Sequence, residues 1–194
     1  MPGDVVSLDI QFDVGGKLLP VIHSRGWWDL IMALTRKGVV VVLAAGNGGL
    51  DLSPAAGNMD QFGDSGGTLV GACYHSSGER VYFSNYNHPT SRINSWGDWS
   101  VVTTGYGSLQ RKPGNDRNYA NDYAGTSSAT PLSSGALALI QSYAIAKFGI
   151  YLNASGMRTI ISDTGYSEGV GGKIGHRPNV DAAIAELFKL YNKS

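Results

Sequence analysis

The chain has 194 residues, which is enough for one domain with a sizeable core but too short for two complete domains. Fifteen Lys and Arg residues balance fifteen Asp and Glu residues, and neither sign forms a long run, so we expect no nucleic acid and no anionic membrane surface as a partner. The 27 glycines and the low charged fraction of 15% indicate a compact chain rich in tight turns rather than a disordered one.

The first part of the chain predicts a strand, a helix and a buried strand. Apolar and β-branched residues favour a strand over Asp4–Phe12, and a connector then runs through Pro20. An amphipathic helix follows, with Ser24 as its cap and its end at residues 36–38; one face carries Trp27, Leu30, Ile31 and Leu34. The unbroken apolar run over 39–45 is typical of a strand buried on both faces. This βαβ order predicts an α/β fold that is doubly wound around a mostly parallel sheet.

The second part predicts a surface loop, short strands and three further helices. Residues 46–67 form the loop, and strands are expected over 68–73, 80–83 and 101–104. A buried helix is expected over Ser133–Phe148 and a second helix over Ser155–Ser162. Asn179 is expected to cap the last helix, whose apolar face carries Val180, Ile184, Leu187 and Tyr191.

Several residue types are assigned structural roles. Cys73 is the only cysteine, so no internal disulfide can form, and we expect a buried thiol. The longest apolar run is too short to cross a bilayer, and no signal peptide is visible at the start. The paired tryptophans are expected to be core and packing residues; they are Trp27, Trp28, Trp96 and Trp99.

The stretch GTSSATP, with Ser127 at its centre, stands where a loop turns into a helix. The helix start directs backbone N–H groups and a partial positive charge towards any negative charge that develops beside Ser127, as happens in acyl transfer. Taken alone, a small hydroxyl residue at this place is more often a helix cap than a nucleophile. Both interpretations stay open on this stretch by itself.

The stretch AAGNGG, Ala44 to Gly49, follows the buried strand at the sheet edge where α/β proteins place their ligand crevices. Asn47 is either a turn residue or an amide donor that points into the crevice. The order of Asn47 and Ser127 and their separation in the sequence indicate a catalytic site more strongly than either stretch does alone.

Together these stretches resemble the subtilisin-like serine proteases, the subtilase family, over most of the chain. GTSSATP fits the nucleophile signature Gly-Thr-Ser-x-Ala-x-Pro, which implies a catalytic Ser127, and VVVVLAAGN resembles the strand that leads to the oxyanion-hole asparagine, here Asn47. RVYFSNYNHPTSRINSWG, VVTTGYG and GHRPNVDAAIAEL resemble a bacterial branch of the family. Where the family pattern has histidine after the proline, this chain has Leu132, and that position is structural in the family.

The resemblance also implies which residues contact the substrate. DVVSLDI resembles the strand that pairs with the substrate backbone, so Ser7, Leu8 and Asp9 are expected to border it, although the family usually has glycine in place of Asp9. The remaining expected substrate-binding residues are Ala44, Ala45, Gly46 and Thr126. A carboxylate at Asp9 would favour basic substrate residues, but a strand carboxylate is more often solvated or paired.

The triad order in the family is Asp, His, Ser, and the segments that carry the first two residues precede the strand at residues 4–12. None of His23, His75, His88 and His176 is followed by Gly-Thr, and each is expected to be a surface or hydrogen-bonded histidine. We therefore interpret residues 1–194 as the carboxyl-terminal portion of one subtilisin-like peptidase domain. An unpaired sheet edge would then favour association with the amino-terminal portion of the protease or with a second copy.

Three functional hypotheses follow. The first is a serine endopeptidase fragment acting on a peptide or protein substrate, with Asp and His supplied from outside the chain. The second is a catalytically silent peptide-binding domain that uses the strand backbone at Ser7 to Asp9. The third, an α/β esterase, is disfavoured because Ser127 is not in a Gly-x-Ser-x-Gly elbow.

No cofactor is required by this chemistry. Calcium is implied by the resemblance alone; the loop with Asp51, Asp60 and Asp64 offers oxygen ligands, but the spacing matches no compact calcium loop, and a solvated acidic loop is the alternative. The resemblance likewise implies a secreted or cell-envelope protein.

Overall fold

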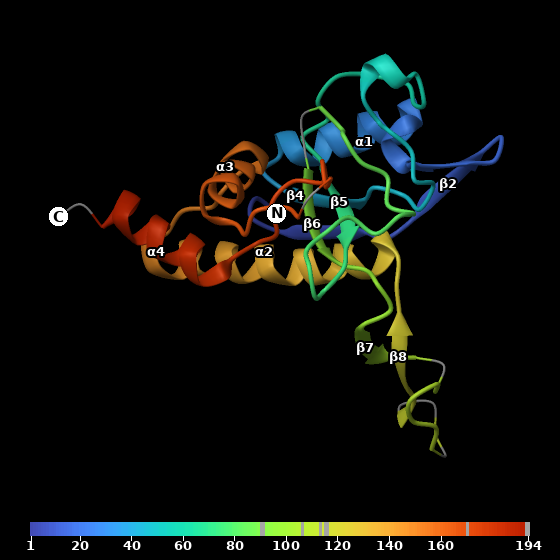
Figure 1. Cartoon of the computed structure of the whole chain (residues 1–194). Coiled ribbons are helices and arrows are strands. Elements are labelled where there is room, and N and C mark those ends of the chain that lie inside the picture. The colour runs from blue at the N-terminus through green and yellow to red at the C-terminus, as the bar shows by residue number, and fades with distance from the viewer. Residues whose placement is uncertain (90–91, 106, 113, 115–116, 170, 193–194) are drawn as a thin grey trace.

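The computed structural model describes residues 1–89, 92–105, 107–112, 114, 117–169 and 171–192. A four-stranded parallel sheet in the order β1-β4-β5-β6 lies at its centre; the strands are β1 (Val5–Leu8), β4 (Val40–Ala44), β5 (Thr68–Cys73) and β6 (Arg92–Trp96). One face is covered by α1 (Arg25–Arg36), and the other faces α2 (Thr126–Phe148), α3 (Ala154–Thr164) and α4 (Val180–Tyr191) (Figure 1). The predicted α/β fold with a parallel sheet is confirmed.

The strand β4 is buried along its whole length, as the apolar run predicts. Successive side chains alternate between the faces of a strand, so Val40 and Val42 join the core beside α2 while Val41 and Leu43 join the core beside α1. Each fully buried side chain of this size stabilises the fold by roughly 1.5–3 kcal/mol relative to an exposed one. The central position of β4 therefore fixes both layers of helices against one strand.

The predicted strand over Asp4–Phe12 is wrong beyond Leu8. After β1, the chain forms β2 (Gln11–Val14), which pairs antiparallel with β3 (Lys17–Pro20). Gly15 and Gly16 form the turn with φ of 60° and 83°, and a two-residue turn with positive φ at both positions matches the twist of a hairpin. The segment interpreted as a connector is therefore a hairpin arm; the short 3-10 helix η1 (Val21–His23) then leads into α1.

Among the later strands, those expected over 68–73 and 101–104 are confirmed as β5 and β7 (Val101–Thr104). The strand expected over 80–83 is wrong: Arg80 forms only an isolated bridge with Cys73, and a turn closes from Ser84 N–H to Val81 O. Two strands went unpredicted, β6 and β8 (Tyr119–Tyr123), because their polar residues lack an apolar pattern. The loop over 46–67 contains one short 3-10 helix, η2 (Pro54–Ala56).

The helix expected from Ser133 begins earlier, at Thr126, and ends at Phe148 as predicted. Pro131 lies inside this helix and has no N–H to donate to the carbonyl of Ser127, one turn earlier. The Tyr123 hydroxyl donates to that carbonyl at 2.7 Å instead. A side chain from β8 thus replaces the missing backbone hydrogen bond and lets the helix continue through the proline.

The other helices begin close to their predicted starts. Asn179 caps α4 as expected, because its side chain accepts a hydrogen bond from Ala182 N at 3.1 Å. The helix expected over Ser155–Ser162 is α3, which Asn153 caps by accepting from Gly156 N at 2.9 Å. Ser24 occupies the cap position of α1, although its side chain makes no capping hydrogen bond.

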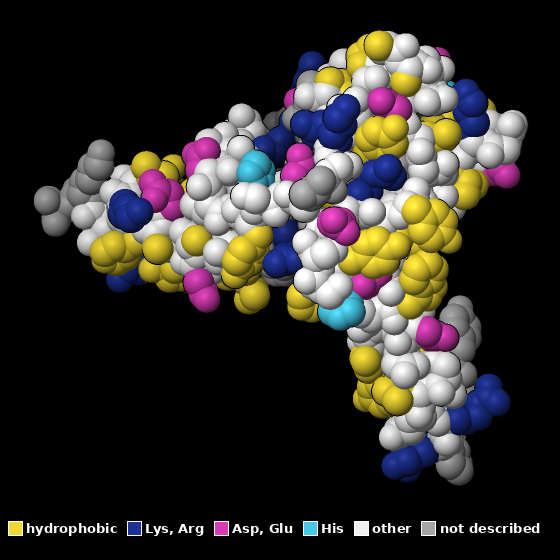
Figure 2. All heavy atoms as spheres, viewed as in Figure 1, with side chains coloured by type: hydrophobic (Ala, Val, Ile, Leu, Met, Phe, Trp, Pro, Cys, Tyr) yellow, Lys and Arg dark blue, Asp and Glu magenta, His cyan; other side chains and the backbone are white. Residues whose placement is uncertain are grey.

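The antiparallel pair β7 and β8 forms an arm that projects away from the body of the molecule (Figure 1). Exposed apolar side chains lie along this arm and include Val102, Leu109 and Tyr119, whereas basic side chains lie near its tip (Figure 2). Since β8 ends at Tyr123, the arm leads directly into the start of α2.

The cysteine and the four tryptophans differ in how deeply they are buried. Cys73 is fully buried, and burial raises the pKa of its thiol. Trp27 and Trp28 pack against Phe12 and Phe62, as expected of packing residues. Trp96 and Trp99 are 42% and 48% exposed, so they are not core residues. Among the described helices, none has the length and apolar character needed to span a membrane.

The histidines differ from one another in their surroundings. His23 accepts a hydrogen bond from Asp60 N at 3.0 Å, and the ring of exposed His75 lies 2.7 Å from a carboxylate oxygen of Asp98. His88 contradicts the expectation, because it is only 6% exposed and its Nδ1 has no hydrogen-bond partner among the described residues. Burial lowers the pKa of His88 from 6.5 to about 4, and the charge of Asp64 opposes this shift.

The depressed pKa of His88 predicts a loss of stability in mild acid. Between about pH 6.5 and pH 4 the unfolded chain binds a proton that the folded chain excludes, so folding stability falls as the pH falls through this window. At pH 5 the loss relative to pH 8 is about 2 kcal/mol from this group. Urea unfolding of the wild type and of His88→Gln at pH 5 and pH 8 measures this loss in the free energy of unfolding. The variant should lose about 2 kcal/mol less than the wild type. Equal losses in the two proteins would contradict a buried neutral imidazole.

Candidate active site

The start of α2 places Ser127 at the second helical position, after the cap residue Gly125. Gly125 has φ of 94°, a left-handed conformation that favours glycine, and its N–H donates to Gly97 O at 2.9 Å. Ser127 is half-buried, and its Oγ has no hydrogen-bond partner among the described residues. The hydroxyl is therefore held at the positive end of a long helix without being used as a cap.

Asn47 lies beyond the carboxyl end of β4, after Ala45 and Gly46. Gly46 has φ of 97°, and a Cβ at this position would lie 2.6 Å from Asn85 Nδ2 and 2.8 Å from Leu18 O. Only glycine fits this turn, which sends the chain from the sheet towards α2. The backbone N–H of Asn47 donates to Gln11 Oε1 at 2.7 Å, and this contact fixes the residue from the hairpin side.

The Asn47 side chain is bonded to the start of α2. Its Oδ1 accepts from Thr126 N at 2.9 Å and from Thr126 Oγ1 at 3.0 Å. The Thr126 hydroxyl accepts in turn from Gly46 N at 3.2 Å. The two sequence motifs therefore lie side by side, and the residue next to Ser127 bonds directly to Asn47.

These bonds occupy the amide oxygen and leave the amide nitrogen available. No described residue accepts a hydrogen bond from Asn47 Nδ2, which lies within 3.2 Å of the position that a Cβ on Gly125 would take. The N–H of Ser127 belongs to the first turn of α2, where backbone N–H groups have no intrahelical acceptor. Two N–H donors thus lie at the start of α2, the helical turn that carries the Ser127 hydroxyl, and donors of this kind can stabilise a developing oxyanion.

The expected substrate-binding residues are not equally accessible. Ser7 and Leu8 are half-buried at the end of β1, and Ser7 Oγ donates to Asp9 Oδ1 at 2.5 Å. Ala44 and Ala45 are 1% and 4% exposed, and Thr126 is fully buried. The register places Ser7 and Leu8 beside Val42 and Leu43 of β4, so these segments share the carboxyl edge of the sheet with Asn47.

Two residues that hold the site have no signal in the sequence. Gln11 bonds the Asn47 backbone from the unpredicted hairpin. Asn85 is fully buried: its Nδ2 donates to Leu18 O at 2.7 Å and Ala45 O at 2.8 Å, and its Oδ1 accepts from Gly48 N at 3.1 Å and Leu50 N at 2.8 Å. All four bonds join segments far apart in sequence, so only the folded chain identifies this amide as the clamp of the Asn47 loop.

The sequence supplies no evident proton acceptor for Ser127. No histidine in the described part of the chain forms a hydrogen bond with its hydroxyl. His75 and Asp98 form a histidine–carboxylate pair, and burial of Asp98 is outweighed by hydrogen bonds from Ser100 and His75, which lower the pKa of Asp98. This pair is exposed at His75, and among the described residues neither of its members forms a hydrogen bond with Ser127, so the geometry does not join it to the nucleophile.

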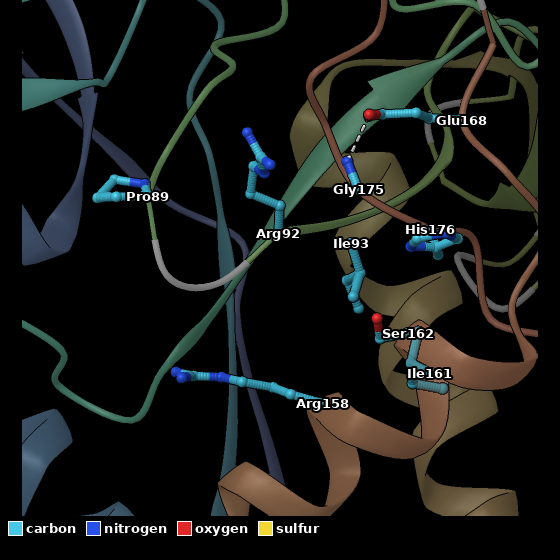
Figure 3. Close-up of a pocket in the computed structure, with 9 residues that line it drawn as sticks. All are labelled: Pro89, Arg92, Ile93, Arg158, Ile161, Ser162, Glu168, Gly175 and His176. Carbon is cyan, nitrogen blue, oxygen red and sulfur yellow. Dashed lines mark hydrogen bonds between the residues drawn. The ribbon is translucent and has the colours of Figure 1, made fainter.

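A separate pocket lies at the amino end of β6, away from these residues (Figure 3). Arg92, Arg158 and His176 are among the residues that line it, and Glu168 Oε2 accepts a hydrogen bond from Gly175 N at 2.7 Å. Neither Ser127 nor Asn47 lines this pocket. It therefore does not belong to the candidate active site, which lies at the opposite, carboxyl edge of the sheet.

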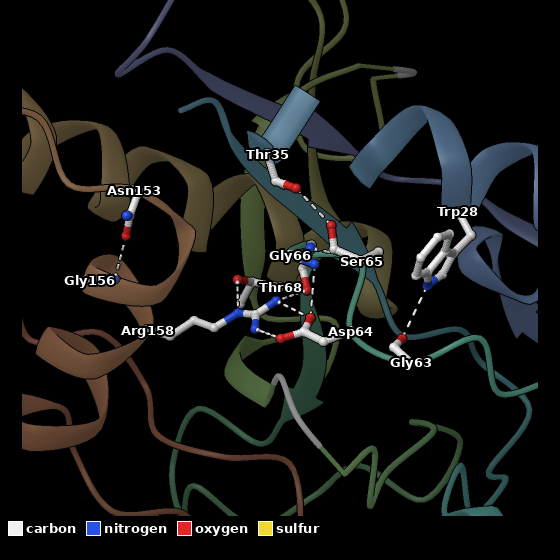
Figure 4. Close-up of polar contacts among 11 residues, drawn as sticks. Trp28, Thr35, Gly63, Asp64, Ser65, Gly66, Thr68, Asn153, Gly156 and Arg158 are labelled. Atoms are coloured by element: carbon white, nitrogen blue, oxygen red, sulfur yellow. Dashed lines mark hydrogen bonds and ion pairs between the residues drawn. The ribbon is translucent and has the colours of Figure 1, made fainter. Parts of the chain in front are cut away.

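Two of the three acidic residues considered for calcium are occupied by protein donors. Asp64 forms a bidentate ion pair with Arg158, at 2.6 and 3.0 Å, and Arg158 also donates to Gly67 O at 2.6 Å (Figure 4). Asp51 accepts hydrogen bonds from Ser53 N and Asn87 Nδ2. Within the described ranges, no cluster of three or more His, Cys, Asp or Glu side chains could hold a metal ion.

Comparisons with known proteins identify solved structures of the same fold. Solved structures with the same fold include a protease from Pseudoalteromonas arctica PAMC 21717 (24% identity, TM-score 0.66), a lanthipeptide protease (16%, 0.69) and the patellamide maturation protease PatA (22%, 0.64). Each match covers 95% of this chain but 51%, 61% and 63% of the other chain, respectively. The chain thus spans about half to three-fifths of the length of these structures. No curated protein sequence matches it.

A family model gives the sequence-level assignment. The model of the subtilase family, Peptidase_S8, matches residues 21–181, which include both Asn47 and Ser127. The match extends over most of the chain and agrees with the parallel α/β fold and the solved protease structures. The chain belongs to the subtilase family of serine proteases.

Proposed function

We propose that this chain carries the nucleophile and the oxyanion donors of a serine endopeptidase, with Ser127 as nucleophile and Asn47 in the oxyanion hole. The observation that carries the proposal is the bond from Thr126 to Asn47 Oδ1, which leaves Nδ2 available beside the start of α2. An amide nitrogen without an acceptor among the described residues is what an oxyanion donor requires, and a residue that only formed a turn would have no need of it.

The reaction follows from these positions. Ser127 Oγ bonds to the carbonyl carbon of a peptide while its proton passes to a base, and the carbonyl π electrons move to the oxygen. Asn47 Nδ2 and the Ser127 N–H donate to that oxyanion. Its collapse breaks the C–N bond, the leaving amine takes the proton, and water then hydrolyses the acyl ester by the same steps.

The base, a histidine oriented by an aspartate, is proposed to lie on a preceding segment outside residues 1–194. The absence of a hydrogen bond between any described histidine and Ser127 supports this arrangement. The isolated chain is then expected to be inactive, and the amino-terminal portion of the same protease is its natural partner.

The substrate is proposed to be a peptide or protein that lies along Ser7 to Asp9 and the turn at Ala44 to Gly46. The names of the similar structures support a peptide substrate, since both the lanthipeptide and the patellamide maturation enzymes are called proteases. A preference for basic residues has weak support, because the Asp9 carboxylate already accepts a hydrogen bond from Ser7. Calcium binding and a secreted or cell-envelope location remain proposals from family resemblance.

One observation favours a second function, a peptide-binding domain without catalysis. The outer edge of β1 has no strand partner among the described residues, so an extended peptide could pair with it as an added strand. This function needs neither the Ser127 hydroxyl nor the Asn47 amide nitrogen, and chemical labelling distinguishes it from catalysis.

Labelling with a fluorophosphonate probe tests the proposed function. The chain alone should be labelled weakly or not at all, because no base activates Ser127. A protein extended at its amino end by its natural sequence should be labelled at Ser127, as measured by mass spectrometry of the modified peptide. Ser127→Ala in the extended protein should abolish labelling, and Ser134→Ala is the matched control. An unlabelled but folded extended protein would favour the binding function.

The role of the Asn47 amide nitrogen has its own test. Asn47→Asp keeps an oxygen that can accept from Thr126 but replaces the N–H donor, so the fold should persist while kcat of the extended protein falls by at least about 10²–10³. Steady-state peptide hydrolysis and thermal unfolding measure the two effects. Asn121→Ala, on the exposed arm, is the control. An Asn47→Asp protein with normal turnover would remove Asn47 from the oxyanion hole.

Association through the β1 side of the molecule is proposed for the isolated chain. An apolar groove runs beside β1 and α1, and its walls include Val6, Leu8, Trp27, Leu30, Ile31 and Leu34. Leu30 is 60% exposed. A free strand edge beside an apolar groove favours contact with another segment, either the amino-terminal portion of the protease or a second copy.

Sedimentation velocity tests this association. The isolated chain should form dimers or larger species as its concentration rises, and Leu30→Glu should shift it towards monomer because a carboxylate in the groove must be desolvated. Leu139→Glu is the matched control, since Leu139 is 61% exposed on α2, outside this groove. A monomer at all concentrations, or an equal effect of both variants, would contradict the proposed surface.

A further inference from the structure

A second hollow, of about 380 Å³, lies beside α2 between the end of β6 and the segment before α4. Its walls are mostly apolar and include Trp96, Leu132, Ala136, Tyr166 and Pro178. Trp96 is 42% exposed and Tyr166 is 50% exposed, so the aromatic walls are open to solvent. The volume lies within the range of pockets that bind small organic groups, about 300–1,000 Å³.

The hollow contains a positive charge without a negative partner. The guanidinium carbon of Arg177 lies 4.8 Å from the ring centroid of Tyr166 and 5.8 Å from that of Trp96. Burial raises the pKa of the nearby Cys73 thiol, and the charge of Arg177 opposes that rise. In the described ranges, no carboxylate forms an ion pair with Arg177. Two aromatic rings hold the cation in place without compensating its charge.

The wall of the hollow also contains a buried hydroxyl without a partner. Ser133 is 1% exposed and lines the hollow, and its Oγ has no hydrogen-bond partner in the part of the chain that the structure describes. A helical serine usually donates to the carbonyl one turn earlier, as the next residue does: Ser134 Oγ donates to Thr130 O at 2.9 Å. A buried hydroxyl without a hydrogen-bond partner is destabilising, so its presence here requires an explanation.

We propose that this hollow binds a carboxylate that is attached to an apolar or aromatic group. Arg177 pairs with the carboxylate, the Ser133 hydroxyl offers a hydrogen bond, and the rings of Trp96 and Tyr166 pack against the apolar part. Two sources share this chemistry, a free small carboxylic acid and the C-terminal residue of a peptide. Ser127 and Asn47 do not line the hollow, so the site stands whether or not the proposed catalysis is correct.

The hollow is nevertheless joined to the candidate active site. Ser128, next to the nucleophile, donates from its Oγ to Trp96 O at 3.3 Å. Leu132, Ser133 and Ala136 extend along the same helix that begins beside Ser127. A ligand that packs against Trp96 therefore touches a residue whose backbone is bonded to the start of α2.

Isothermal titration calorimetry of the full chain with 3-phenylpropionate tests the proposal. Saturable binding is expected, at least tenfold tighter than binding of the neutral analogue 3-phenylpropanol, because only the acid pairs with Arg177. An N-acetylated dipeptide ending in phenylalanine and its C-terminal amide distinguish the sources. A tighter dipeptide than free acid assigns the site to peptide termini, and the reverse assigns it to small acids.

Variants place the binding in this hollow. Arg177→Gln should weaken 3-phenylpropionate binding at least tenfold, whereas Arg25→Gln, which removes an equal charge from an exposed helix surface, should leave it unchanged. Leu132→Glu should also abolish binding, because the new carboxylate occupies Arg177, and it should leave the fold intact since Leu132 is 38% exposed. Absence of binding at about 10 mM ligand, equal affinity for acid and alcohol, or unchanged binding by both hollow variants would overturn the proposal.

Discussion

The Asn47 carboxamide joins two segments that are 79 residues apart in sequence. One end of the contact is the turn after β4, and the other is the first residue of α2. Because the amide oxygen accepts both donors of Thr126, the orientation of the amide is fixed by the fold and not by a ligand. Preorganised donors need no reorientation when charge develops, which is the property that electrostatic stabilisation of an oxyanion requires.

Three other parts of the fold hold the contact between Asn47 and Thr126 in place. The buried strand β4 fixes the position of Asn47 at the carboxyl edge of the sheet. Gly46 permits the turn that brings Asn47 towards α2. Gln11 holds its backbone from the β2–β3 hairpin, while Asn85 ties the following loop to the sheet. The Ser127 backbone is held by α2 and by the Tyr123 hydroxyl. Its own hydroxyl has no hydrogen-bond partner among the described residues, so it keeps the rotational freedom that a nucleophile needs.

The elements with a strong apolar pattern could be predicted from the sequence. The run over 39–45 and the cap at Asn179 have local causes, complete burial and a side chain that satisfies a helix end, and both occur where expected. The β2–β3 hairpin, β6 and β8 could not be predicted in the same way. The position of β6 depends on pairing with distant segments, as in the bond from Asn94 N to His176 O. The hairpin strands are joined locally by Gly15 and Gly16, but the apolar run over Asp4–Phe12 favours one continuous strand instead. Likewise, the two motifs predicted Asn47 and Ser127 as a pair, but the contacts made by Gln11 and Asn85 exist only in the folded chain.

The bond from the Tyr123 hydroxyl to the Ser127 carbonyl ties the last residue of the β7–β8 arm to the peptide plane of the nucleophile. Pro131 makes this tether necessary, since the helix itself offers that carbonyl no N–H. The end of β8 and the Ser127 backbone are therefore linked by a hydrogen bond. A displacement of β8 at Tyr123 would therefore act directly on the Ser127 carbonyl, at a residue that the oxyanion donors also adjoin.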